Sequence, residues 1–197
     1  MPVAPVMSCT GRPSGGQRHA APAGRPAGRG FSAIELAVVV AILAILSMAA
    51  APAFRESVVR YQLNSVTEDL RTSFAMARAE AARRPEAVWL ERRGACTGGD
   101  DDWDCGWQLV FDANADNLAQ LAEVVRFSIP PAGLSIIHAS GDGVLGSRRV
   151  VFNRWGLPQP AGRRFVLGHA NYPALTRTLC VNGTGGVRVL SGDVTCP

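Results

Sequence analysis

Residues 31–54 read FSAIELAVVVAILAILSMAAAPAF, and this stretch decides the fold of the chain. From Leu36 to Phe54 it holds nineteen residues without a charge. At about 1.5 Å per residue, a helix of that length extends roughly 28 Å, close to the thickness of the hydrocarbon core of a bilayer. The stretch therefore predicts a helix that can span a membrane.

The thirty residues before this stretch have the composition of a leader peptide. They carry four Arg and no Asp or Glu, and they are rich in Gly, Pro and Ala, which cannot build an apolar core. Only Arg55 follows the apolar run closely, so the denser positive charge precedes it. The positive-inside rule then predicts a cytoplasmic N-terminus. Met7 is an alternative start to Met1.

Glu35 lies just inside the apolar segment, where a carboxylate needs a partner. An ionised carboxylate costs on the order of 2.5–3.5 kcal/mol at the centre of a membrane helix and less near its end. If the chain is cut between Gly30 and Phe31, the new amino group lies four residues from Glu35. That amino group can neutralise the carboxylate within one subunit or between neighbouring subunits.

The segment from Arg29 to Leu36, followed by the apolar run, resembles the class III signal of type IV pilins and type II secretion pseudopilins. The resemblance implies that a prepilin peptidase cuts after Gly30 and methylates Phe31. It also implies that Glu35 aligns subunits during assembly. The departures from the family pattern are a long leader and Ser-Ala after Phe31, where Thr-Leu is commoner.

An ordinary secretory signal is the alternative interpretation, with residues 51–53, Ala-Pro-Ala, as its cleavage site. The carboxylate of Glu35 inside the apolar region argues against it. So does the helical pattern, which continues past Ala53 with apolar residues at three- and four-residue spacing. Those residues are Val59, Leu63, Val66, Leu70, Phe74, Ala77 and Ala81. We expect one helix from Phe31 to Arg84, ending before Pro85.

After the helix, the pattern changes to short runs of β-branched and aromatic residues between Gly, Asp, Asn and Pro. The predicted strands are 87–91, 107–111, 123–129, 134–138, 149–153, 164–168, 178–181 and 186–190. The fold class is α+β, with the apolar stripe of the helix covered by a sheet. The chain then divides into a leader (1–30), a membrane and assembly helix (31–54), its amphipathic continuation (55–84) and a β-rich domain (85–197).

Four segments of the chain resemble the minor pilins of the fimbrial T type and pseudopilin H of type II secretion. They are Phe74–Ala81, Gly106–Asp112, Val151–Gly156 and the closing Cys180–Val189. The resemblance extends over residues 29–197 and implies a pilin-like fold, one long helix packed on an antiparallel sheet. It implies a structural subunit of a filament. The sequence offers no nucleophile beside a plausible base, so we expect no enzyme.

Four cysteines follow the apolar helix, on the side predicted to be periplasmic and oxidising. Of the three possible connectivities we favour Cys96–Cys105 and Cys180–Cys196, because each pair brackets a single loop or hairpin. A metal site is disfavoured, since no Cys-x-x-Cys occurs. Asp112, Asn114 and Asp116 alternate like the start of a calcium loop but lack its Gly and its distant Glu. We favour a turn there and expect no cofactor.

The net charge of +4 belongs to the leader, because residues 31–197 hold sixteen Arg and sixteen acids. Within the domain the charge is polarised, with a balance of −7 from Glu86 to Glu123 and of +6 from Arg148 to Pro197. A basic C-terminal face can attract DNA phosphates or an acidic neighbour. The candidates for DNA are Arg148, Arg149, Arg163, Arg164 and Arg188. Of the Gly-Arg-x-Arg-like DNA segment known in fimbrial T-type pilins, only Arg188 carries over.

The sequence thus predicts a minor pseudopilin that helps assemble the pseudopilus of a type II secretion system. The alternative is a minor pilin that initiates a type IV pilus, with DNA uptake as a further role. The resemblance implies other pilin subunits, the prepilin peptidase and methylase, an inner-membrane assembly platform and membrane lipid as partners. It places the chain in the bacterial inner membrane as a single-pass protein with a periplasmic C-terminal domain.

Overall fold

A single long helix, α1, opens the part of the chain that the computed structural model describes, residues 31–94, 99–140 and 146–197. It runs from Ala33 to Arg83, within two residues of the predicted bounds. Ser32 caps it, because the Ser32 Oγ accepts a hydrogen bond from the Glu35 N–H at 3.2 Å. The chain divides between Ala44 and Ile45 into two compact units, and the second unit contains the domain. The predicted leader and Gly30 lie outside the described residues.

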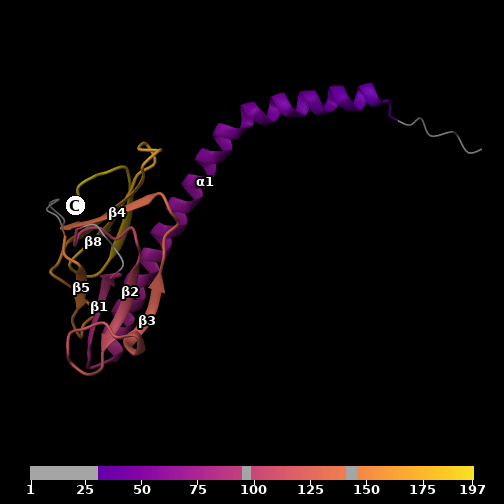
Figure 1. Ribbon diagram of the computed structural model, residues 1–197. Helices are drawn as coiled ribbons and strands as arrows, with labels where there is room; N and C mark the ends of the chain where they lie inside the picture. Colours follow the sequence, from indigo (N-terminus) through magenta and orange to yellow (C-terminus); the bar gives the residue numbers. More distant parts are fainter. Residues whose placement is uncertain (1–30, 95–98, 141–145) are drawn as a thin grey trace, which may run out of the picture. The chain divides into compact units, whose positions relative to one another are not determined.

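Among the described residues, nine strands follow α1 and form two antiparallel sheets (Figure 1). The first sheet has the order β3-β2-β1-β5-β6, and the second has the order β4-β7-β8-β9. The strands are β1 Ala87–Arg92, β2 Trp107–Asp112, β3 Val124–Ser128, β4 Leu134–Ser140, β5 Arg149–Phe152, β6 Pro158–Gln159, β7 Arg163–His169, β8 Arg177–Val181 and β9 Val187–Ser191. A short 3-10 helix, η1 Leu121–Glu123, precedes β3.

All eight predicted strands form, each end within two residues of its expected place. The ninth, β6, has two residues and is too short to show a period of two. It pairs with β5 at the edge of the first sheet, a position where a proline such as Pro158 is tolerated. The division into two sheets also differs from the single sheet that we expected.

The apolar stripe of α1 is the centre of the core. Its seven predicted positions are all buried, from Val59 to Ala81. Phe74 contacts both sheets, since its ring lies 5.9 Å from that of Phe152 on β5 and 5.5 Å from that of Phe165 on β7. Each fully buried Leu or Phe stabilises a fold by about 1.5–3 kcal/mol. The stripe therefore holds the two sheets in one core.

Polar contacts fix the register of α1 on the domain. The Trp107 indole N–H donates to the Ser73 Oγ at 2.9 Å, and both residues are buried. The Arg78 guanidinium donates to the Gly185 carbonyl at 2.8 Å. Gly156 packs so closely on α1 that a Cβ would lie 3.0 Å from the Arg78 carbonyl, and its φ of 69° favours glycine as well.

His138 on β4 is fully buried in an aromatic cluster at the end of the core. Its ring stacks on Phe165 at 4.4 Å and meets Trp103 edge-on at 5.3 Å. Its Nδ1 lies 2.7 Å from the Ser147 carbonyl, an acceptor, so Nδ1 carries the proton. Burial, reinforced by the nearby Arg163, lowers the pKa of His138 to about 4, although Ser147 and Asp101 act in the opposite direction.

This histidine predicts acid sensitivity of the domain. His138 takes up its proton near pH 6.5 in the unfolded chain and only near pH 4 in the folded domain, so its own contribution lowers the free energy of unfolding by about 1.4 kcal/mol per pH unit as the pH drops through that window. Asp104 acts in the opposite direction, because its hydrogen bond with Asp102 raises the pKa of Asp104 to about 6. Above that window, the histidine adds no pH dependence. Urea unfolding of the detergent-solubilised chain, followed by Trp fluorescence, measures this slope.

Two variants isolate the effect. His138→Phe should flatten the slope, whereas His169→Gln, at a partly exposed histidine, should keep it. An unchanged slope in His138→Phe would show that other groups cause the acid sensitivity.

Candidate assembly and binding surfaces

The N-terminal part of α1 is an exposed apolar surface. The segment Ala33–Ala51 has nineteen residues and a mean hydropathy of 2.5, long and apolar enough to cross a membrane by length and composition. Its large apolar side chains are exposed, from Ile34 at 75% to Val39 at 48%. A surface of this extent is a place for lipid or for other helices.

Ser32 and Glu35 define the start of this surface. Ser32 is the N-cap and Glu35 the third residue of the first turn, the spacing of a capping box. A carboxylate in the first turn also interacts favourably with the helix dipole. Sequence reasoning treated Ser32 as a departure from the family pattern and missed the cap, although the Ser-x-x-Glu spacing was a signal for it.

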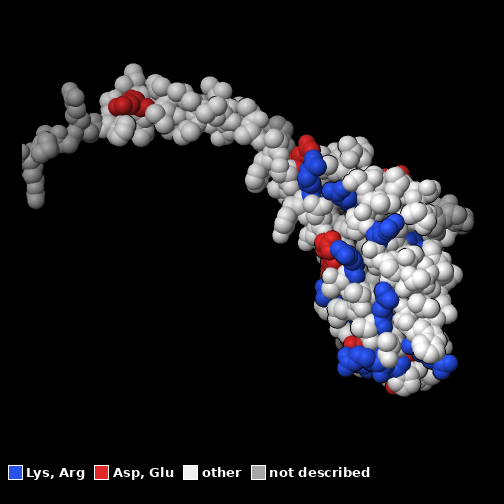
Figure 2. All heavy atoms as spheres, turned by 180° about the vertical axis from the view of Figure 1, so that it is seen from behind, with Lys and Arg blue, Asp and Glu red and all other residues white. Residues whose placement is uncertain are grey.

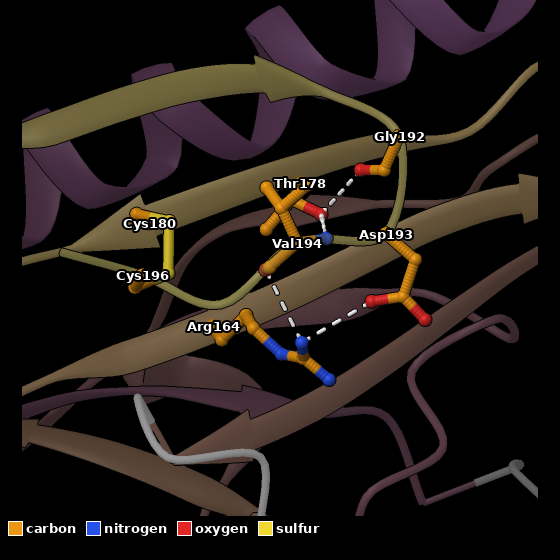
Figure 3. Close-up of a disulfide and its surroundings, with 7 residues drawn as sticks. All are labelled: Arg164, Thr178, Cys180, Gly192, Asp193, Val194 and Cys196. Carbon is orange, nitrogen blue, oxygen red and sulfur yellow. Dashed lines mark hydrogen bonds and ion pairs between the residues drawn. A yellow bond between two sulfur atoms is a disulfide. The ribbon is translucent and has the colours of Figure 1, made fainter.

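The C-terminal tail forms a second distinctive feature, a strap over residues 192–197. A disulfide joins Cys180 on β8 to Cys196, as the hairpin spacing predicted (Figure 3). The Thr178 hydroxyl donates to the Gly192 carbonyl at 2.6 Å and accepts from the Val194 N–H at 3.2 Å. Closing a loop of this length stabilises a fold by about 3 kcal/mol in the chain-entropy model.

Arg164 on β7 holds the middle of the strap. Its guanidinium donates to the Val194 carbonyl at 3.2 Å and pairs with the Asp193 carboxylate at 3.2 Å (Figure 3). The strap therefore lies along β7 and β8, fixed at several points. Cys96 lies outside the described residues, so the Cys96–Cys105 pairing stays a prediction.

The five candidate DNA-binding arginines do not form one surface. Arg163 is buried, and this burial lowers the pKa of its guanidinium. Arg164 serves the strap, and Arg149 pairs with the buried Glu91 at 3.2 Å. Arg148 and Arg188 are exposed. Including Arg163 in a basic face was wrong, because odd-numbered β7 residues such as Phe165 and Leu167 point into the core.

The charge asymmetry along the sequence is partly cancelled inside the first sheet. Antiparallel pairing places Arg149 of the basic segment opposite Glu91 of the acidic one. The Arg149 guanidinium also lies 4.5 Å above the ring of Trp89, a cation–π contact. On the face shown in Figure 2, the arginines stand in separate groups with uncharged surface between them. Sequence reasoning missed Glu91 and Trp89 because their roles depend on strand register.

The Asp112–Asn117 segment closes as a hydrogen-bonded turn. The Asp112 carboxylate accepts the N–H groups of Asp116 and Asn117, both at 3.1 Å. Glu123 accepts the Ala113 N–H at 3.0 Å. Asp112, Asp116 and Glu123 bring carboxylate oxygens within 4.8 Å of one another, whereas Asn114 donates its amide to Asp116. The geometry is that of a turn, and we propose no calcium role for it.

Trp155 is exposed in a turn that packs on α1. The Asn153 side chain accepts the N–H groups of Trp155 and Leu157, both at 3.0 Å, which fixes the turn. Trp155 is 71% exposed, in contrast to the fully buried Trp103. Trp103 therefore belongs to the core and Trp155 to the turn.

Comparison with known proteins assigns the family. The family model described as Type II transport protein GspH matches residues 66–185, more than half of the chain. The chain belongs to the GspH family. The match covers the stripe of α1 from Val66 onward and most of the domain, and it leaves out the apolar helix and the strap. No curated protein sequence matches the chain.

The chain is similar to solved structures of two proteins. A crystal form of the Pseudomonas aeruginosa type IV minor pilin FimU is 21% identical, with a TM-score of 0.51 over 66% of this chain and 90% of FimU. The Vibrio cholerae minor pseudopilin EpsH of the Type 2 Secretion System is 10% identical, with a TM-score of 0.49 over 66% of this chain and 97% of EpsH. The FimU likeness establishes a pilin-like α+β fold, and GspH-family membership supports a minor pilin or pseudopilin role.

Proposed function

We propose that this GspH-family chain is a minor pseudopilin of a type II secretion system, which helps assemble the periplasmic pseudopilus used for protein export. The observation that carries the proposal is that the GspH family match begins on the same helix that carries an exposed apolar segment of membrane length. The leader would be cut between Gly30 and Phe31 and Phe31 would be methylated. The N-terminus would stay in the cytoplasm, and the domain would lie in the periplasm.

The exposed apolar helix suits a subunit that moves from the inner membrane into a filament. In the inner membrane, lipid solvates residues 31–54. In the filament, the helices of other pilin subunits replace the lipid, and Glu35 pairs with the Phe31 ammonium of a neighbour. A buried carboxylate without that partner carries a cost of a few kcal/mol. The correct register between neighbouring subunits is therefore the one in which the charge of the Glu35 carboxylate is neutralised.

The partners under this proposal are other pilin and pseudopilin subunits, the peptidase that methylates Phe31 and the inner-membrane assembly platform. The subunit acts by packing and not by catalysis. Its buried histidine and paired arginines serve the fold, and the scattered basic groups do not favour DNA binding.

The role of Glu35 is separable from helix capping. Glu35→Gln removes the charge and should abolish entry into filaments, because the Phe31 ammonium then has no counter-charge. Ser32→Ala removes the cap, which costs about 1 kcal/mol at an exposed helix end, and should leave assembly intact. The measurement is the amount of each variant in sheared filaments relative to its amount in membranes. Normal assembly of Glu35→Gln, or equal loss in both variants, would contradict an alignment role.

Deletion of the gene separates secretion from pilus function. In the source bacterium we expect loss of exported proteins from the culture supernatant, with surface pili unchanged, because the pseudopilus drives export. Mass spectrometry of the supernatant and electron microscopy of the cells provide the two readouts, and the wild-type gene on a plasmid is the control. Loss of pili with normal export would make the chain a type IV minor pilin.

A further inference from the structure

The end of the domain at which α1 enters it carries an unusual set of side chains. Phe54 is the last residue of the uncharged run, and Arg60 follows six residues later on α1, about 9 Å along the helix. The headgroup layer of a bilayer is about 5–8 Å thick on each side of the hydrocarbon core. An arginine side chain bends toward that layer while its stem stays on the helix. The Arg60 guanidinium is therefore within reach of lipid phosphates.

A pocket of about 180 Å³ opens beside Arg60. Its walls come from α1 at Arg60 and Leu63, from the β7–β8 loop up to Thr176 and Arg177, and from Ser191 at the end of β9. The Arg177 guanidinium donates to the Ser191 Oγ at 2.7 Å, which fixes its position while leaving other N–H groups for a ligand. Two arginines thus line one small pocket.

The charge balance of this pocket favours an anion. Among the described residues that line it, none is acidic. Arg60 pairs with Glu56 one turn earlier at 2.7 Å, but both side chains are about half exposed, and pairs of that kind contribute little. Arg55 adds a further positive charge nearby on α1. A phosphate group can therefore compete with Glu56 for Arg60, and Arg offers it a bidentate fork.

An exposed tyrosine points to a lipid surface. The chain has two tyrosines, of which Tyr61 is exposed and Tyr172 is partly buried against the core. Tyr61 is 74% exposed and adjoins Arg60 on α1. Tyr172 lies in the β7–β8 loop, where its carbonyl accepts the Leu175 N–H at 2.9 Å in the turn that forms a wall of the pocket. Tyrosine is enriched at membrane–water interfaces, because its ring is apolar and its hydroxyl is polar.

We propose that this end of the domain binds the headgroup phosphate of an anionic phospholipid between Arg60 and Arg177. The inference rests on the proposed function, in which residues 31–54 span the membrane. An anionic leaflet attracts each Arg near its surface by about fivefold in affinity. The contact holds the domain against the membrane in the stored subunit and is lost when the subunit enters the filament. Anionic lipid therefore favours the stored form.

The test uses the full-length chain in lipid nanodiscs made of phosphatidylcholine alone or mixed with phosphatidylglycerol. Hydrogen exchange of residues 170–177 should be slower in the mixed discs, because the bound headgroup orders the loop. Arg60→Gln/Arg177→Gln should remove this difference. Arg71→Gln/Arg188→Gln is the matched control, with the same change in charge at one α1 arginine and one strand arginine outside the pocket, and it should keep the difference.

Each other outcome overturns a defined part of the proposal. Equal exchange in both kinds of disc, or an equal loss in the control variant, rejects the headgroup site. Inorganic phosphate added to phosphatidylcholine discs should have no effect; slowing as strong as that from phosphatidylglycerol would make the pocket a site for free anions. Failure of the wild-type chain to insert into either disc would reject the membrane anchor itself, and with it the proposed function.

Discussion

The apolar stripe of α1 is the contact on which both sheets depend. Each sheet has an inner face of Val, Leu, Ile and Phe that needs cover, and the helix from Val59 to Ala81 supplies it. Phe74 contacts a phenylalanine of each sheet, so the two sheets share one core through the helix. Because the same helix begins with the exposed apolar segment, one continuous element carries both that segment and the stripe in the core.

Buried polar groups then make this packing specific. The Ser73–Trp107 and Arg78–Gly185 hydrogen bonds connect α1 to strands that are far away in sequence. An indole N–H without an acceptor would be costly in this core, so the bond selects one register of the helix. The disulfide and Arg164 complete the second sheet by fixing the strap along β7 and β8. Arg78 and Arg164 are thus committed to the structure of the domain itself.

Local patterns in the sequence were sufficient to predict the helix and the strands but not to predict which strands pair. The three- and four-residue spacing identified every buried position of the stripe, because a helix face is determined by neighbours in sequence. The Cys180–Cys196 bridge was also local, since it closes a single hairpin. The Glu91–Arg149 pair and the inward position of Arg163 depend on which strands meet and in which register. No short-range pattern carries that information.

The central claim is that the chain matures into a pilin-type subunit whose helix starts at a free amino group beside Glu35. The family match begins at residue 66, so the assignment of the N-terminal region rests on its own chemistry. Intact-mass measurement of the protein extracted from membranes tests it directly. The account predicts a chain that begins at Phe31 and carries one added methyl group. A chain that begins after Ala53, or one that keeps its leader, would contradict it.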